Sequence, residues 1–116
     1  MDDCAAQFLD DPNTEEARSW LTGARPDLFR SLGEEGSTEM SIQLVDEIYA
    51  AGAEKVLAVE IDREDDMENT GKLLIRLPDG ASDRESVLAI LGKIAESQGF
   101  DAEPDIGQKY VFVMLD

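Results

Sequence analysis

Two stretches of alternating residues constrain the fold more than any other feature of the chain. Residues 55–62, with the sequence KVLAVEID, and residues 72–78, with the sequence KLLIRLP, place apolar side chains at every second position. Successive side chains of a strand point to opposite faces of a sheet, so this pattern predicts two strands that each have one apolar face. The predicted apolar faces consist of Leu57, Val59 and Ile61 in the first strand and of Leu73, Ile75 and Leu77 in the second.

Amphipathic helices are predicted on either side of this pair of strands. In residues 37–52, apolar residues recur at helical spacing after a Ser-Thr pair, and Gly52 ends the pattern. In residues 82–99, Ser82 and Glu85 have the spacing of a capping box, in which each side chain bonds a free amide of the first helical turn. Both helices can cover the apolar face of the strands.

A final strand is predicted at residues 110–115, where YVFVML has apolar residues on both faces and should be covered on both sides. The resulting order is helix, strand, strand, helix, strand. It predicts an α+β fold with a small three- or four-stranded sheet and two amphipathic helices on one face. The order resembles the ferredoxin-like, split β-α-β arrangement with its first strand missing or disguised.

The chain is long enough for one domain, which we divide into an N-terminal arm, residues 1–33, and a core of residues 34–116. Asn13 and Glu16 have capping-box spacing and predict one short helix in the arm. A second short helix is predicted over residues 26–33, which start with proline and end with glycine. Neither helix is long enough to be stable alone, so the arm must pack on another surface.

Residues 28–32 allow two arrangements. They could form the missing strand and pair with residues 110–115. Alternatively, the arm stays helical and residues 110–115 lie parallel to residues 72–77 through a right-handed crossover. We favour the second arrangement, because the arm could then cover the outer face of the last strand.

Charge limits the partners of the protein. The chain has 27 acidic and 10 basic residues, so its formal net charge is −17. Nucleic acids and anionic membranes require a positively charged surface, so neither is expected as a partner. Identical copies should repel each other at low salt, whereas a basic protein would be attracted.

Other chemistry is limited by residue types that the chain lacks or holds once. It has no histidine and a single cysteine, Cys4, so catalytic sites built on imidazole and internal disulfides are excluded. No cofactor is predicted. The sequence has neither a basic, apolar leader nor an apolar run long enough for a membrane span, which predicts a cytoplasmic location.

The acidic run of residues 60–68 is the candidate metal site. Asp62, Glu64 and Asp66 match the first ligand positions of a calcium-binding EF-hand. That loop also needs glutamate at its twelfth position, where this sequence has Leu73. A hydrated loop between two strands is therefore the favoured interpretation, with a divalent-cation site as the alternative.

The alternation also suggests how the first two strands pair. If Val59 faces Ile75, the apolar faces match and Asp62 lies opposite Lys72. Lys72 and Arg76 are then expected to pair with acids of the first strand.

Four residues are candidates for binding a ligand or a partner: Trp20, Phe29, Arg76 and Tyr110. The aromatic residues could line a pocket between the arm and the sheet, and Arg76 could hold an anion. Because no catalytic motif is present, we expect a non-catalytic interaction or regulatory domain that meets another protein, or a second copy, through a sheet edge or the arm. The alternatives are a small-molecule-binding domain with that pocket and an enzyme that uses carboxylates and a divalent cation.

Overall fold

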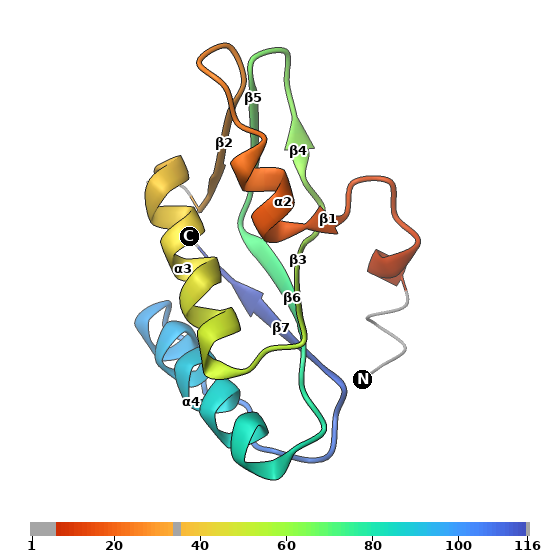
Figure 1. Cartoon of the computed structure of the whole chain (residues 1–116), viewed down its shortest axis with the longest axis vertical. Coiled ribbons are helices and arrows are strands. Elements are labelled where there is room, and N and C mark those ends of the chain that lie inside the picture. The colour runs from red at the N-terminus through yellow and green to blue at the C-terminus, as the bar shows by residue number, and fades with distance from the viewer. Residues whose placement is uncertain (1–6, 34–35, 116) are drawn as a thin grey trace.

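A long, bent hairpin forms the centre of the α+β fold (Figure 1). The computed structural model describes residues 7–33 and 36–115. Strands β3 (Lys55–Ala58) and β4 (Asp62–Arg63) form the outgoing arm of the hairpin, and β5 (Met67–Thr70) and β6 (Lys72–Arg76) form the returning arm. Pairing within the hairpin is antiparallel throughout.

A bend at the middle of the hairpin divides its strands between two sheets. Glu60 has a φ of 51°, in the left-handed region, and Gly71 lies where a Cβ atom would come within 2.4 Å of the carbonyl oxygen of Leu115. The hydroxyl of Thr70 donates to the carbonyl of Val59 at 2.6 Å and ties the two arms together at the bend. The sheets have the strand orders β1-β3-β6-β7 and β2-β5-β4.

Strands near both ends of the chain complete the sheets. Strand β1 (Glu15–Glu16) pairs with β3, and β7 (Tyr110–Met114) pairs with β6, both in antiparallel orientation. Strand β2 (Phe29–Leu32) pairs with β5 in parallel. Residues 28–32 are therefore largely a strand, and the favoured prediction of a wholly helical arm is wrong. The alternative was right about the strand but wrong about its partner.

Three of the helices in the described part of the chain pack against these strands. Helix α3 (Thr38–Ala51) begins after Ser37, whose hydroxyl accepts the amide of Met40, and ends at Gly52, as predicted. Helix α4 (Ala81–Ser97) begins after Gly80 without a side-chain cap, so the predicted capping box is wrong. Its first helical residue precedes Ser82, which leaves the serine inside the first turn.

Helix α2 (Ala17–Thr22), in contrast, begins later than predicted, because its N-cap is Glu16 and not Asn13. The Glu16 carboxylate accepts the amides of Arg18 and Ser19 at 3.0 and 2.8 Å. It also accepts the Tyr49 hydroxyl at 2.7 Å, which links α2 to α3. Burial, reinforced by this hydrogen bond, raises the pKa of Tyr49 to about 12.

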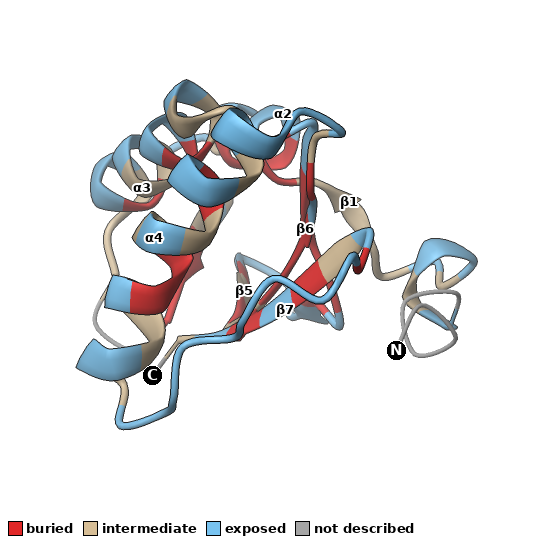
Figure 2. Cartoon of the chain, turned by 90° about the horizontal axis from the view of Figure 1, so that it is seen from below, coloured by how far each residue is buried: buried red, intermediate tan, exposed pale blue. Residues whose placement is uncertain are grey.

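The main core lies between the helices and the four-stranded sheet (Figure 2). Its members include Trp20, Val45, Ile48, Val87 and Leu91 from the helices and Val56, Ala58, Leu73, Ile75, Val111 and Val113 from the strands. A smaller cluster, formed by Leu57, Val59 and Leu74 with Phe8 and Tyr110, lies apart from it. The apolar face predicted for residues 72–78 is confirmed.

The face and register predicted for residues 55–62 are wrong. Val56, not Val59, lies opposite Ile75, and Asp62 lies opposite Asn69. The bend at Glu60 interrupts the alternation that the prediction extended through the whole segment. Lys72 still pairs with an acid of the first strand, since its ammonium contacts the carboxylate of Glu60.

The last strand lies beside β6, as predicted, but antiparallel to it. After α4, residues 98–109 run back past the helix before β7 begins, and this return segment reverses the direction of the strand (Figure 1). The α+β class is thus observed with two sheets, and the ferredoxin-like order is not confirmed.

Candidate protein-binding edge

Two of the strands at the sheet edges are very short. Strands β1 and β4 contain two residues each, and all four of these residues are charged. Short length and charge are the common means by which proteins prevent an edge strand from pairing with another chain. Neither edge is therefore suited to binding an extended partner.

The edge of β2 is closed by helix α3. Parallel pairing with β5 turns the backbone groups of Arg30 and Leu32 away from that strand. The amide of Leu32 donates to the hydroxyl of Ser41 at 2.8 Å, and the hydroxyl of Thr38 donates to the carbonyl of Arg30 at 2.6 Å. Side chains of α3 thus occupy the positions that an additional strand would need.

Strand β7 lies at the other edge of the four-stranded sheet. Among the described residues, β6 is the only strand paired with β7, so the outer edge of β7 has no strand beside it there. The amide of Leu115 donates to the carbonyl of Gly71 at 2.6 Å, just beyond the end of the paired strands. Hydrogen-bonded residues alternate in an antiparallel pair, so the amides and carbonyls of Phe112 and Met114 point away from β6.

The side chains of β7 alternate in the same way. Val111 and Val113 are buried in the main core, whereas Phe112 is 37% and Met114 is 41% exposed. The ring of Phe8 stacks on Phe112 with 5.5 Å between the ring centroids and leaves it partly uncovered. The strand contains no charged residue and no proline, so it lacks the features that usually protect an edge. The prediction that both faces of this strand are covered therefore holds only in part, because Phe8 of the arm covers the outer face incompletely.

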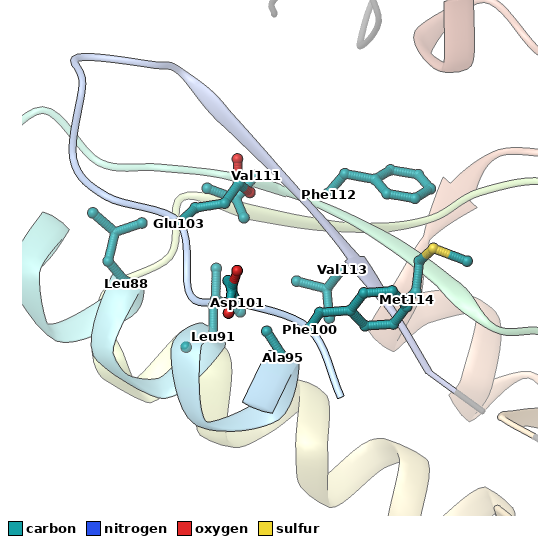
Figure 3. A pocket seen from close by; sticks show the side chains of 11 residues that line it. Leu88, Leu91, Ala95, Phe100, Asp101, Glu103, Val111, Phe112, Val113 and Met114 are labelled. Atoms are coloured by element: carbon teal, nitrogen blue, oxygen red, sulfur yellow. The ribbon is translucent and has the colours of Figure 1, made fainter. Parts of the chain in front are cut away.

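A cavity of about 170 Å³ lies beside this edge, between α4 and β7 (Figure 3). Its apolar wall includes Leu88, Leu91 and Ala95 of α4, Phe100, and Val111 and Val113 of β7. Asp101 and Glu103 of the return segment complete the wall, and both are exposed. The cavity therefore combines an apolar interior with an acidic rim.

Side-chain contacts hold the return segment against α4. The Arg84 guanidinium donates to both carboxylate oxygens of Asp105, at 2.6 and 3.2 Å. This hydrogen bond lowers the pKa of Asp105. A Cβ atom at Gly92 would lie 3.0 Å from the Cβ of Ala102, so the segment packs closely on the helix. The acidic side of the cavity is thus attached to the framework of the domain.

The structure separates the four residues predicted to bind a ligand or partner. Trp20 is buried in the main core, and Phe29 is exposed at the start of β2 in the other sheet. Arg76 and Tyr110 lie together, with the guanidinium carbon 5.8 Å from the ring centroid, and Arg76 also pairs with Glu54 at 3.5 Å. The four residues therefore form no common site, and a pocket between arm and sheet would have to form without the Trp20 ring.

The candidate metal ligands lie on the distal half of the hairpin. Asp62, Glu64 and Asp66 are all exposed, and the carbonyl of Asp66 accepts the amide of Phe29 at 2.9 Å. Within residues 7–33 and 36–115, no group of three or more His, Cys, Asp or Glu side chains is arranged to hold a metal ion.

Sequence reasoning missed Glu68, the last acid of the predicted hydrated run, which is buried. Its carboxylate accepts the indole N–H of Trp20 at 2.9 Å and pairs with Arg30 and Arg63, each at 3.0 Å. Burial alone would raise the pKa of Glu68, but the hydrogen bonds from Trp20 and Arg63 and the two positive charges outweigh burial and lower it. This network ties β5 to α2, β2 and β4, and no local pattern in the sequence indicates it.

Comparisons with known proteins identify no relative. No protein-family model matches the chain, and neither curated proteins nor solved structures include one with significant similarity to it. None of the helices formed by the described residues combines the length and hydropathy needed to cross a lipid bilayer.

Proposed function

We propose that this protein is a non-catalytic interaction domain that binds an extended segment of another protein along the free edge of β7. Addition of a strand to an open sheet edge is a common mode of peptide recognition, in which backbone hydrogen bonds supply affinity. The observation that carries the proposal is the outward-facing backbone of Phe112 and Met114, together with the exposure of both side chains.

Charge favours a different protein over a second copy as the partner. Pairing β7 with the β7 of another copy would bring together two chains that each carry a net charge of −17. Repulsion between them opposes association, most strongly at low salt. A partner segment with basic residues gains from the same charge.

The dimensions of the cavity favour a protein partner over a small molecule. Pockets for small ligands usually have volumes of about 300–1,000 Å³. The cavity beside β7 has about 170 Å³, which is room for one side chain of a longer segment. For this cavity we therefore rank a small molecule below a side chain of a bound protein segment.

Selection from a library of random ten-residue peptides displayed on phage tests the proposal. We expect selected peptides to bind the wild-type chain and to lose binding to Phe112→Pro. Proline removes an outward-facing N–H, so the pairing of β7 with β6 keeps its hydrogen bonds. Phe112→Thr serves as the control, because it shortens the side chain but retains the N–H.

The synthetic form of a selected peptide provides a second control. Methylation of its alternate backbone nitrogens should abolish binding if a strand is added, while its side chains are unchanged. Selected peptides that bind Phe112→Pro as tightly as the wild-type chain, or that tolerate methylation at every backbone nitrogen, would overturn the proposal. A stable dimer of the free protein, detected by light scattering, would indicate that the partner is a second copy of this chain and not a different protein.

A further inference from the structure

If the edge of β7 binds an extended segment, as in the proposed function, the cavity beside β7 limits which segments can bind. A strand added to β7 would continue the sheet, so every second side chain would point toward the side on which α4 lies. Val113 of β7 points to this side, and Phe112 points to the other (Figure 3). One inward-pointing side chain of the added strand would therefore lie over the cavity.

The interior of the cavity suits an apolar side chain of moderate size. A cavity of roughly 150 Å³ lined by aliphatic and aromatic residues can hold a benzene molecule. The cavity between α4 and β7 has about 170 Å³ and is walled mainly by Leu88, Leu91, Ala95 and Phe100 together with β7. Leucine, isoleucine or phenylalanine fits this volume, whereas alanine would leave most of it unfilled.

The rim of the cavity favours positive charge in the same segment. Asp101 and Glu103 line the cavity, and none of the described residues that line it is basic. Asp101 and Glu103 are also exposed, so they can meet a lysine or arginine of a bound strand without being buried. Charges placed in this way raise the rate of association more than the final affinity, and their effect decreases with salt.

We infer that the β7 edge takes an extended, basic segment of a partner protein, with one leucine, isoleucine or phenylalanine that enters the cavity beside α4. The backbone of the segment pairs with Phe112 and Met114. Its apolar side chain selects the register of the added strand, and its basic residues face Asp101 and Glu103. Edge, cavity and rim thus recognise three different features of one ligand.

A designed peptide tests the apolar part of this inference. The probe is a nine-residue peptide of alternating lysine and valine with phenylalanine at its centre, and binding is measured by fluorescence anisotropy. Replacing the central phenylalanine by alanine should weaken binding to the wild-type chain at least tenfold. Ala95→Phe, which fills the cavity from α4, should weaken binding of the parent peptide to a similar extent.

Ala89→Phe is the matched control, because it makes the same substitution at an exposed position of α4. It should leave the affinity unchanged. Circular dichroism checks that both variants fold. If Ala95→Phe does not fold, the peptide with alanine at its centre still tests the cavity, because it is measured on the wild-type chain.

The acidic rim is tested by the double variant Asp101→Asn with Glu103→Gln. At low salt it should reduce the affinity for the parent peptide severalfold, and the difference should shrink at high salt. The control double variant, Glu64→Gln with Asp65→Asn, removes the same charge from exposed positions on the distal part of the hairpin and should have a smaller effect.

The outcomes separate this inference from the proposed function. If the designed peptide fails to bind, or binds equally well with alanine at its centre, the inference is wrong. The same holds if the two double variants behave alike. The proposed function still stands if the selected library peptides no longer bind the Phe112→Pro variant. It fails if they bind this variant as tightly as the wild-type chain.

Discussion

Replacing Glu68 by alanine tests the polar network that joins the three strands of the smaller sheet to helix α2. The side chain of Glu68 is only 11% exposed, and its carboxylate holds the indole of Trp20 and the guanidinium groups of Arg30 and Arg63. Removal of the carboxylate leaves three donors without this acceptor. The variant therefore measures how much this one buried acid, in a run of mostly exposed acids, contributes to the free energy of unfolding.

The expected cost follows from the burial of each donor. A buried donor left unpaired costs about 1–3 kcal/mol, and removal of one partner from a buried ion pair costs roughly 3–5 kcal/mol. The side chains of Arg30 and Arg63 are 17% and 31% exposed, so water can replace part of the lost contact. We therefore expect Glu68→Ala to lower the free energy of unfolding by about 3 kcal/mol. Glu68→Gln keeps one carbonyl acceptor and should lower it by about 1.5 kcal/mol.

Urea unfolding measures these changes, with the emission of Trp20, the single tryptophan, and circular dichroism as independent signals. Glu64→Ala is the matched control, because Glu64 belongs to the same acidic run but is exposed. Its effect should stay within about 0.5 kcal/mol. A loss below about 1 kcal/mol for Glu68→Ala would show that the network does not stabilise the fold.

The same residue should make stability depend on acid. Folding lowers the pKa of Glu68, so its contribution is fully present above the unfolded value of about 4.3. The contribution is lost as pH falls through the lower pKa of the folded state. Glu68→Gln should therefore lose less stability than the wild-type chain as the pH falls below about 4.3. Equal losses for the two chains would contradict the shift.

Three further predictions concern other contacts. Folding raises the pKa of Tyr49 to about 12, so its contribution to stability should decline between about pH 10 and 12, and thermal unfolding of Tyr49→Phe should lack this decline. Arg84→Ala should leave the free energy of unfolding nearly unchanged, because Asp105 is 46% exposed, yet amide exchange in residues 105–107 should become faster; unchanged exchange would contradict the role of Arg84. Gly52→Ala should cost about 1–3 kcal/mol in urea unfolding, because φ is 122° and the added Cβ would lie 3.1 Å from Asp83; a neutral effect would contradict this.

The parts of the fold that could be predicted depend on local interactions. Ser37 caps α3 through an amide three residues away, and Gly52 supplies the positive φ at the other end, so a short window of sequence contains both signals. The apolar face of β6 follows from its own alternation. Such features require no knowledge of what lies across the sheet.

The features that could not be predicted depend on distant partners. Glu60 adopts a positive φ although it is neither glycine nor asparagine, so nothing in its own identity indicates the bend. The bend places Ile61 in the main core, to which Val56 also belongs, and makes the pairing with β6 differ from a continuous alternation. Strand Phe29–Leu32 pairs with β5. This pairing is possible because the bend separates β5 from the four-stranded sheet.

The candidate site was only partly indicated by sequence. The apolar residues on both faces of β7 predicted a strand covered on both sides, whereas Phe112 and Met114 remain exposed. Two-sided hydrophobicity is also what an edge that receives a partner requires, and sequence alone does not separate these cases. The position of the cavity depends on the path of the return segment, for which the sequence has no periodic signal.

Hydrogen exchange at the β7 amides tests most directly whether β7 is the binding edge. In the free monomer, the amides of Phe112 and Met114 should exchange quickly, because they point away from β6, while those of Val111 and Val113 should be protected. A bound library peptide should protect Phe112 and Met114 with little change at the valines. Protection of Phe112 and Met114 in the free monomer, or their continued fast exchange when the peptide is bound, would contradict the assignment of β7 as the binding edge.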